Sequence, residues 1–113
     1  MAKLYDLEDR TLKFARTVNE YVNKLSRSVS NIEISKQLVR SAGSVGANYI
    51  EANESLSKKD FIMRIKISRK EAKESRYWLE LSEPKQDQEQ VRENLIDEAV
   101  QLMKIFSSIY RNG

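Results

Sequence analysis

Lysine and arginine recur at helical spacing between residues 58 and 76, a stretch with eight cations and three acids and therefore a net charge of +5. At 100° per residue, seven of these cations fall on one arc of about 120°, opposite a row of apolar residues. We call these seven the basic stripe: Lys58, Lys59, Lys66, Arg69, Lys70, Lys73 and Arg76. Cations in a row can meet several phosphates of a nucleic acid and release its counterions. The spacing therefore predicts RNA or DNA as a ligand.

The predicted contact is to the phosphate backbone or to the shape of the nucleic acid. The sequence contains neither a helix-turn-helix nor a zinc-finger motif that could read bases. Tyr77 lies at the edge of the basic stripe, where its ring could stack on a base. The alternative is a helix face that meets only solvent, which is the usual role of a charged run.

A second set of residues predicts a polar network between two helices. Small and charged polar residues share one side of the stretch 34–56, and others flank the core side of the next helix. The predicted members are Arg40, Ser41, Ser44, Asn48, Glu51 and Glu71. Buried polar groups must be paired, and such pairing sets the register of two helices. The alternative is a metal site built from Glu51, Glu71 and Glu74, but the ferritin-like pattern also needs histidine, and the chain has none.

The composition excludes several kinds of catalysis. Without cysteine there are no disulfides and no thiolate chemistry, and without histidine there is no Ser-His-Asp arrangement and no imidazole ligand. An RNA-cleaving site that pairs an arginine with a histidine cannot be completed either. We therefore expect no enzyme, no catalytic residues, no metal and no cofactor.

Hydrophobic periodicity predicts an all-α protein of one domain spanning residues 1–113. The expected helices cover about residues 6–26, 32–55, 58–81 and 88–110, and the chain has only one proline and three glycines. Asp6, Asn31 and Ser57 are the expected N-caps. Because the connections are short, the helices should form an antiparallel up-down-up-down four-helix bundle.

The second expected helix has too little charge around it to be an ordinary surface helix. A small and apolar side, away from its core face, contains Gly43 and Gly46, and each glycine costs about 0.5–1 kcal/mol in a helix unless close packing offsets it. A helix broken at these glycines is the alternative. We expect this side to contact another subunit, with Trp78 as a further anchor. The alternative for Trp78 is packing within the chain with its indole N–H bonded. The predicted oligomer interface comprises Val39, Gly43, Ala47, Ile50 and Trp78.

Charge is unevenly distributed along the chain. The net charge is +3, but residues 83–98 hold six acids and two bases, a net of −4. A scaffold that binds an acidic protein partner is therefore an alternative to nucleic-acid binding. Neither a signal peptide nor an apolar run long enough to span a bilayer is evident, so we expect a cytoplasmic protein without a membrane partner.

Residues 37–81 carry a resemblance to a known family. They contain the strings QLVRSAGSVGANYIEA and DFIMRIKISRKEAKESRYWLEL, which resemble the small four-helix-bundle proteins encoded in 23S ribosomal RNA intervening sequences. The recurring elements are Arg40-Ser41, Ser44-Val45, Ala47-Asn48, Glu51-Ala52, Asp60-Phe61, Glu71-Ala72, Glu74-Ser75 and Tyr77-Trp78-Leu79. Gly46 is a departure, because many family members carry proline there.

The resemblance implies a four-helix bundle that assembles into a ring, a homopentamer. It also implies similarity to the accessory variability proteins of diversity-generating retroelements, basic pentameric bundles that bind nucleic acid and a reverse transcriptase. The family has no established enzymatic activity, and most members have no assigned molecular function.

Overall fold

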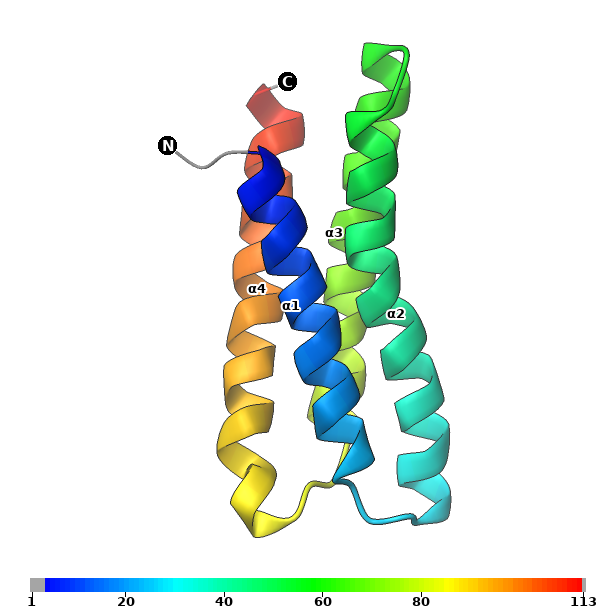
Figure 1. Ribbon diagram of the computed structural model, residues 1–113, viewed down its shortest axis with the longest axis vertical. Helices are drawn as coiled ribbons and strands as arrows, with labels where there is room; N and C mark the ends of the chain where they lie inside the picture. Colours follow the sequence, from blue (N-terminus) through cyan, green and yellow to red (C-terminus); the bar gives the residue numbers. More distant parts are fainter. Residues whose placement is uncertain (1–3, 113) are drawn as a thin grey trace.

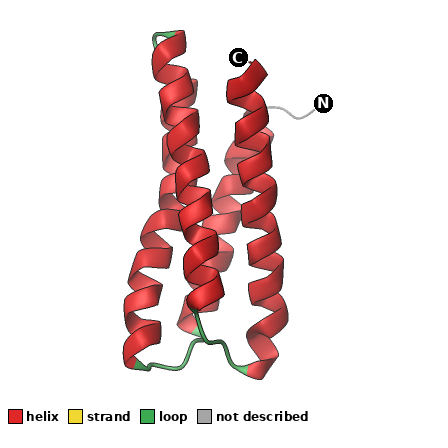
Figure 2. Cartoon of the chain, turned by 180° about the vertical axis from the view of Figure 1, so that it is seen from behind, coloured by secondary structure: helices red, strands yellow, loops and turns green. Residues whose placement is uncertain are grey.

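The computed structural model describes residues 4–112, which form a bundle of four long helices. They are α1 (Leu4–Asn23), α2 (Val29–Asn53), α3 (Lys58–Leu81) and α4 (Glu89–Asn112), and the short 3-10 helix η1 (Gln86–Gln88) directly precedes α4. Successive helices run in opposite directions (Figure 1), and the connecting loops lie at the two ends of the bundle (Figure 2). The prediction of an all-α, up-down-up-down four-helix bundle is confirmed.

The interior is a single apolar core with a contribution from every helix. Phe14, Val18 and Tyr21 of α1 recur every three or four residues and are buried, as the helical period requires. Tyr49 of α2 meets Phe106 of α4 with ring centroids 5.9 Å apart, and burial raises the pKa of the Tyr49 hydroxyl. The core thus joins α2 to α4 across the bundle.

The start of α2 differs from the sequence-based expectation. Ser28, not Asn31, is the N-cap, and its hydroxyl oxygen accepts the backbone N–H of Asn31 at 3.1 Å. Asn31 is buried instead, and its side chain links two loops. Its Nδ2 donates to the carbonyls of Ser26 and Glu83, while its Oδ1 accepts the N–H of Glu83 at 3.1 Å. The loop before α2 is therefore tied to the loop after α3.

The other helix boundaries follow ordinary capping rules. Ser57 caps α3 by accepting the N–H of Asp60 at 3.1 Å, as predicted. α1 begins at Leu4, so Asp6 lies in its first turn, where a carboxylate stabilises the helix dipole without being the cap. α2 continues through Gly43 and Gly46 without a break, so the alternative of an interrupted helix is wrong.

The helices do not pack equally against their neighbours. α2 and α3 contact each other most extensively among the described helices, whereas α1 and α4 share a much smaller interface. Arg10 of α1 bridges the interface between α1 and α4. It donates from Nε and Nη2 to the two carboxylate oxygens of Glu98, at 2.6 and 2.8 Å. This hydrogen bonding raises the pKa of the Arg10 guanidinium. None of the described helices combines the length and apolar character that crossing a membrane requires.

Candidate nucleic-acid interface

The exposed side of α3 carries the basic stripe over its whole length. Lys58, Lys59, Lys66, Lys70 and Lys73 are exposed, and only Arg69 and Arg76 are half-buried. Ile65, Ala72 and Leu79 on the opposite side of α3 are fully buried in the core. Core packing thus sets the rotation of α3, which directs the five lysines outward and leaves the two arginines at the edge of the exposed side.

Most charges of the basic stripe are not neutralised by other described residues. Among residues 4–112 only one member forms an ion pair, Arg76, whose Nε lies 3.8 Å from the Glu80 carboxylate one turn away. The other six cations have no acidic partner in that part of the chain. The stripe is therefore a row of mostly free positive charge.

Two cations of the basic stripe contact α4. Arg69 donates from Nε to the Ser107 hydroxyl at 2.7 Å, and the ammonium group of Lys66 lies 5.3 Å from the centre of the Tyr110 ring. The second distance suits a cation–π interaction. These contacts hold the middle of the stripe against the C-terminal half of α4.

α4 adds two cations that the sequence-based prediction missed. Lys104 and Arg111 line a hollow of about 510 Å³ between α3 and α4, together with Arg69 of the basic stripe. Ser107, Ser108 and Asn112 contribute polar groups to the same hollow. A usable indication was present in the sequence, because residues 99–113 contain these two cations and no acid.

Apolar and aromatic groups lie among the cations. Met63 is exposed beside Lys59, Lys66 and Lys70, and these residues line a shallow hollow of about 440 Å³. Tyr77 is also exposed, and its ring meets Trp78 edge-on at a centroid distance of 5.0 Å. The face thus combines positive charge with groups on which a nucleobase can stack.

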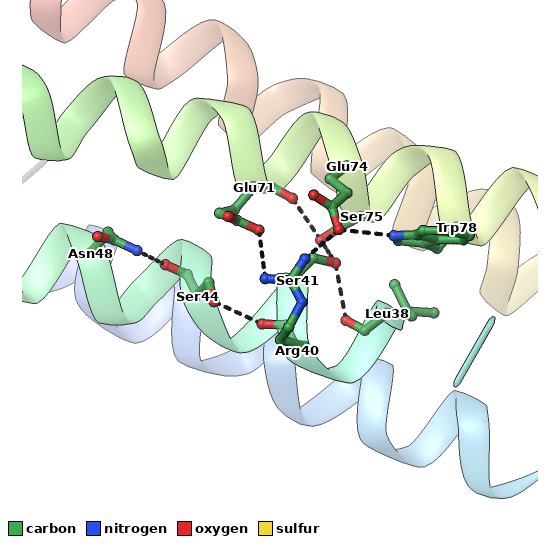
Figure 3. Close-up of polar contacts among 9 residues, drawn as sticks. All are labelled: Leu38, Arg40, Ser41, Ser44, Asn48, Glu71, Glu74, Ser75 and Trp78. Carbon is green, nitrogen blue, oxygen red and sulfur yellow. Dashed lines mark hydrogen bonds and ion pairs between the residues drawn. The ribbon is translucent and has the colours of Figure 1, made fainter. Parts of the chain in front are cut away.

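The predicted polar network lies on the other side of α3, against α2, and we call it the α2–α3 seam. The hydroxyls of Ser41 and Ser75, both fully buried, lie 2.9 Å apart (Figure 3). Ser68 donates to the carbonyl of Val45, and Arg64 donates to Oδ1 of Asn48, both at 2.9 Å. The polar groups of the seam therefore bond to one another across the helix pair.

Arg40 joins the acidic members of the seam. Its guanidinium contacts Glu74 and lies 3.5 Å from Glu71, whose Oε1 is buried and has no hydrogen bond (Figure 3). Glu74 also accepts the indole N–H of Trp78 at 3.0 Å. Because a cation already faces both carboxylates, the metal-site alternative is not supported. Among residues 4–112 no three acidic side chains cluster as metal ligands would.

Two predicted members of the network do not cross to α3. Ser44 donates to the carbonyl of Arg40 within α2, at 2.9 Å (Figure 3). Glu51 is exposed, and its carboxylate forms no hydrogen bond or ion pair with another residue in the described chain. Glu51 was predicted as a member of the network but does not join it, whereas Asn48 on the same side of α2 is half-buried and bonded to Arg64.

The residues predicted for an oligomer interface separate into two places. Val39 and Ile50 of α2 are exposed to 41% and 47%, Ala47 is exposed, and a Cβ atom at Gly43 would meet nothing within 4 Å. These four residues form one open side of α2, which we call the α2 outer face. Trp78 lies apart from it, half-buried on α3 and bonded to Glu74.

Gly46 has its close neighbour within the same chain. A Cβ atom at this position would lie 2.8 Å from Oγ1 and 3.1 Å from Cβ of Thr11 in α1, well inside ordinary contact distance. Glycine is therefore needed where α1 crosses α2. The close approach that the glycines suggested is intramolecular at Gly46, whereas Gly43 remains open.

Two comparisons bear on the whole bundle. The family model described as 23S rRNA-intervening sequence protein matches residues 5–108. A crystal structure of a protein of unknown function, from the S23 ribosomal protein family of Bacteroides thetaiotaomicron, is also similar. It has 36% sequence identity and a TM-score of 0.79, and the match covers 97% of this chain and 99% of that chain. No curated protein matches the chain.

Proposed function

We propose that this chain, which belongs to the 23S rRNA-intervening sequence protein family, binds structured RNA or DNA as a non-enzymatic homo-oligomer. The observation that carries the proposal is the row of six cations of the basic stripe that have no ion-pair partner among residues 4–112. Exposed cations that the fold leaves unpaired are available to an external polyanion.

The length of the basic stripe suits a nucleic-acid backbone. From Lys58 to Arg76 the helix rises about 27 Å at 1.5 Å per residue. Duplex DNA carries one charge about every 3.4 Å along each strand, so a strand alongside α3 presents several phosphates to the stripe. Contacts of this kind position the protein without reading sequence. We therefore expect selection by shape rather than by base sequence.

Self-association would use the α2 outer face and multiply the basic stripe. This face is free of charged side chains from Ser41 to Ile50, and its exposed Val39 and Ile50 would be buried against a second copy. Each copy brings another stripe, so a ring would gain affinity through avidity. A ring of five subunits is the assembly that the family resemblance implies.

The test is a binding titration of purified protein with a structured RNA and a DNA duplex over a range of salt concentrations. We expect the logarithm of the affinity to fall linearly with the logarithm of salt, with a slope of about 0.9 for each duplex phosphate contacted. The mass of the protein, measured in the same buffers, should correspond to several subunits.

A charge-reversal variant assigns the binding to the basic stripe. Replacing Lys66, Arg69, Lys70 and Lys73 by Glu should weaken binding at least about 100-fold and leave the helical content unchanged. The matched control replaces four exposed cations of α1 and the following loop by Glu, which changes the net charge equally: Lys13, Arg16, Lys24 and Arg27. Equal binding by the two variants would contradict the proposal.

An acidic protein partner is the second candidate, and the uneven charge favours it. The acids of residues 83–98 lie on the loop after α3, η1 and the first half of α4, away from the basic stripe. A similarly acidic surface on another protein would complement the stripe. Absence of RNA and DNA binding at low salt, with retained binding of an acidic protein, would favour this candidate.

A further inference from the structure

We propose that the hollow between α3 and the C-terminal half of α4 is a phosphate-binding subsite. It would hold one phosphate of the nucleic acid, while the basic stripe contacts the adjacent phosphates of the same strand. That the phosphate belongs to a nucleic acid rests on the proposed function. The subsite itself rests on the side chains that line the hollow.

The cations of this hollow come from two helices and converge on one space. Arg69 is contributed by α3, and Lys104 and Arg111 by α4, around a volume of about 510 Å³. No described residue that lines the hollow is acidic, and none of the three cations forms an ion pair among residues 4–112. An anion there would meet positive charge from both sides.

Arg69 keeps donors available for a bidentate contact. Its Nε donates to Ser107 at 2.7 Å, and its two Nη groups have no hydrogen-bond acceptor among the described residues. The guanidinium is half-buried, so part of its conformational freedom is already lost before a ligand binds. A planar fork with free donors matches two oxygens of a phosphate better than a lysine does.

The two serines of the hollow keep their protons for a ligand. Ser107 accepts from Arg69, and Ser108 accepts from Nδ2 of Asn112 at 3.3 Å. A hydroxyl oxygen that accepts a hydrogen bond can still donate its own proton. Both hydroxyls can therefore donate to phosphate oxygens beside the three cations.

The position in the bundle connects this hollow to the basic stripe. Lys66 lies one turn before Arg69 on α3, and its partner Tyr110 lies one turn after Ser107 on α4. The dipole at the C-terminus of α4 disfavours an anion on the helix axis but stabilises Arg111 in the last turn. The phosphate therefore lies beside α4 and not on its axis, and the side chains of α4 bind it there.

The larger hollow between α1 and α4 lacks these properties. It measures about 630 Å³ and is lined by Phe14 and Leu95 together with Arg10 and Glu98. The last two bind each other through two hydrogen bonds, so the guanidinium there is already occupied by a carboxylate. This hollow therefore holds one acid and one unpaired cation, Lys13, whereas the α3–α4 hollow holds three unpaired cations and no acid among the described residues.

The first experiment is an NMR titration with inorganic phosphate as the probe. Phosphate should shift the Nε–Hε signal of Arg69 and the backbone amides of Ser107, Ser108 and Arg111. Arg69→Lys keeps the charge but removes the fork, and it should reduce phosphate affinity by about tenfold. Shifts confined to other regions, or an unchanged affinity in Arg69→Lys, would overturn the inference.

The second experiment uses a structured RNA. The double variant Lys104→Gln, Arg111→Gln should bind about tenfold more weakly and lower the salt slope by about 0.9 for each lost duplex contact. The control Arg16→Gln, Lys24→Gln removes two exposed charges of α1 and the residue after it, and should bind as the unmodified protein does.

The outcomes separate the subsite from the proposed function. Equal RNA binding by the double variant and the control would overturn the subsite and leave the role of the basic stripe intact. Phosphate shifts in the hollow without any RNA or DNA binding would uphold the subsite, assign it to a small phosphorylated compound and overturn the proposed function.

Discussion

α3 has two polar sides that differ in how their charges are balanced. On the α2–α3 seam, Arg40 faces Glu71 and Glu74, and the buried hydroxyls of Ser41 and Ser75 bond to each other. On the basic stripe, six of seven cations have no ion-pair partner among residues 4–112. One helix thus presents a side whose carboxylates face a cation and a side whose cations, among residues 4–112, mostly face no acid.

Burial explains the difference between the two sides. A buried polar group without a partner costs about 1–3 kcal/mol, so the fold requires pairing at Ser41, Ser68 and Ser75, which are fully buried. An exposed cation is solvated by water, and a surface ion pair adds only about 0–1 kcal/mol. Folding therefore explains the seam but places no demand on the basic stripe, which is why we propose an external ligand for the stripe.

The contrast is tested most strongly by placing leucine on each side of α3. Ser75→Leu forces a larger apolar side chain against the Ser41 hydroxyl in a space without room for it, and it should lower the free energy of unfolding by about 3 kcal/mol. Lys73→Leu on the basic stripe should change that energy by less than about 0.5 kcal/mol. Urea unfolding followed by circular dichroism measures both. Similar losses in the two variants would show that the sides do not differ.

A second test removes one cation from each kind of environment. Arg40→Met leaves the carboxylate of Glu71, which is only 7% exposed, without its cation and should cost about 2 kcal/mol. Lys36→Met breaks an exposed pair with Glu33 and should cost less than about 0.5 kcal/mol. The same urea titrations measure both variants, and a negligible effect of Arg40→Met would show that the seam does not depend on this ion contact.

The two glycines of α2 compare a position packed against α1 with a position on the α2 outer face. The same substitution is made at both, and the expected changes in stability are the smallest of the three tests. Gly46→Ala brings a Cβ atom to 2.8 Å from Thr11 Oγ1 and should destabilise the chain by about 1 kcal/mol, despite the better helix propensity of alanine. Gly43→Ala meets nothing within 4 Å and should stabilise the monomer by up to about 1 kcal/mol. Thermal unfolding of dilute monomer measures both. The reverse order would mean that α1 does not cross α2 as described.

The fold was predictable because the helical period of apolar residues is repeated in each segment. The rotation of α3 followed from the same pattern, since Ile65, Ala72 and Leu79 point inward and thereby send the basic stripe outward. Ser57 was recognised as a cap because it directly precedes a helix with Asp60 three residues later. These are local features, and they need no knowledge of the neighbouring helices.

The errors concern residues whose role depends on another helix or loop. Asn31 has the chemistry of a cap, but Ser28 starts the helix earlier, and Asn31 instead bonds to a loop 52 residues away. Glu51 shares a stripe with seam residues, but the position of α3 leaves it in solvent. Lys104 and Arg111 join the α3–α4 hollow only because α3 lies beside α4. The helical period of one segment does not predict which residues of other helices or loops it will contact.

The bond between Asn31 and Glu83 has a consequence for how the chain folds. Neighbouring helices can pair early because their contacts close short loops, whereas this bond joins residues 52 positions apart and must wait until α2 and α3 have paired. An interaction that forms after the transition state slows unfolding without accelerating folding. We therefore expect the Asn31 link to slow unfolding more than it accelerates folding, which the folding and unfolding rates of an Asn31→Ala variant would measure.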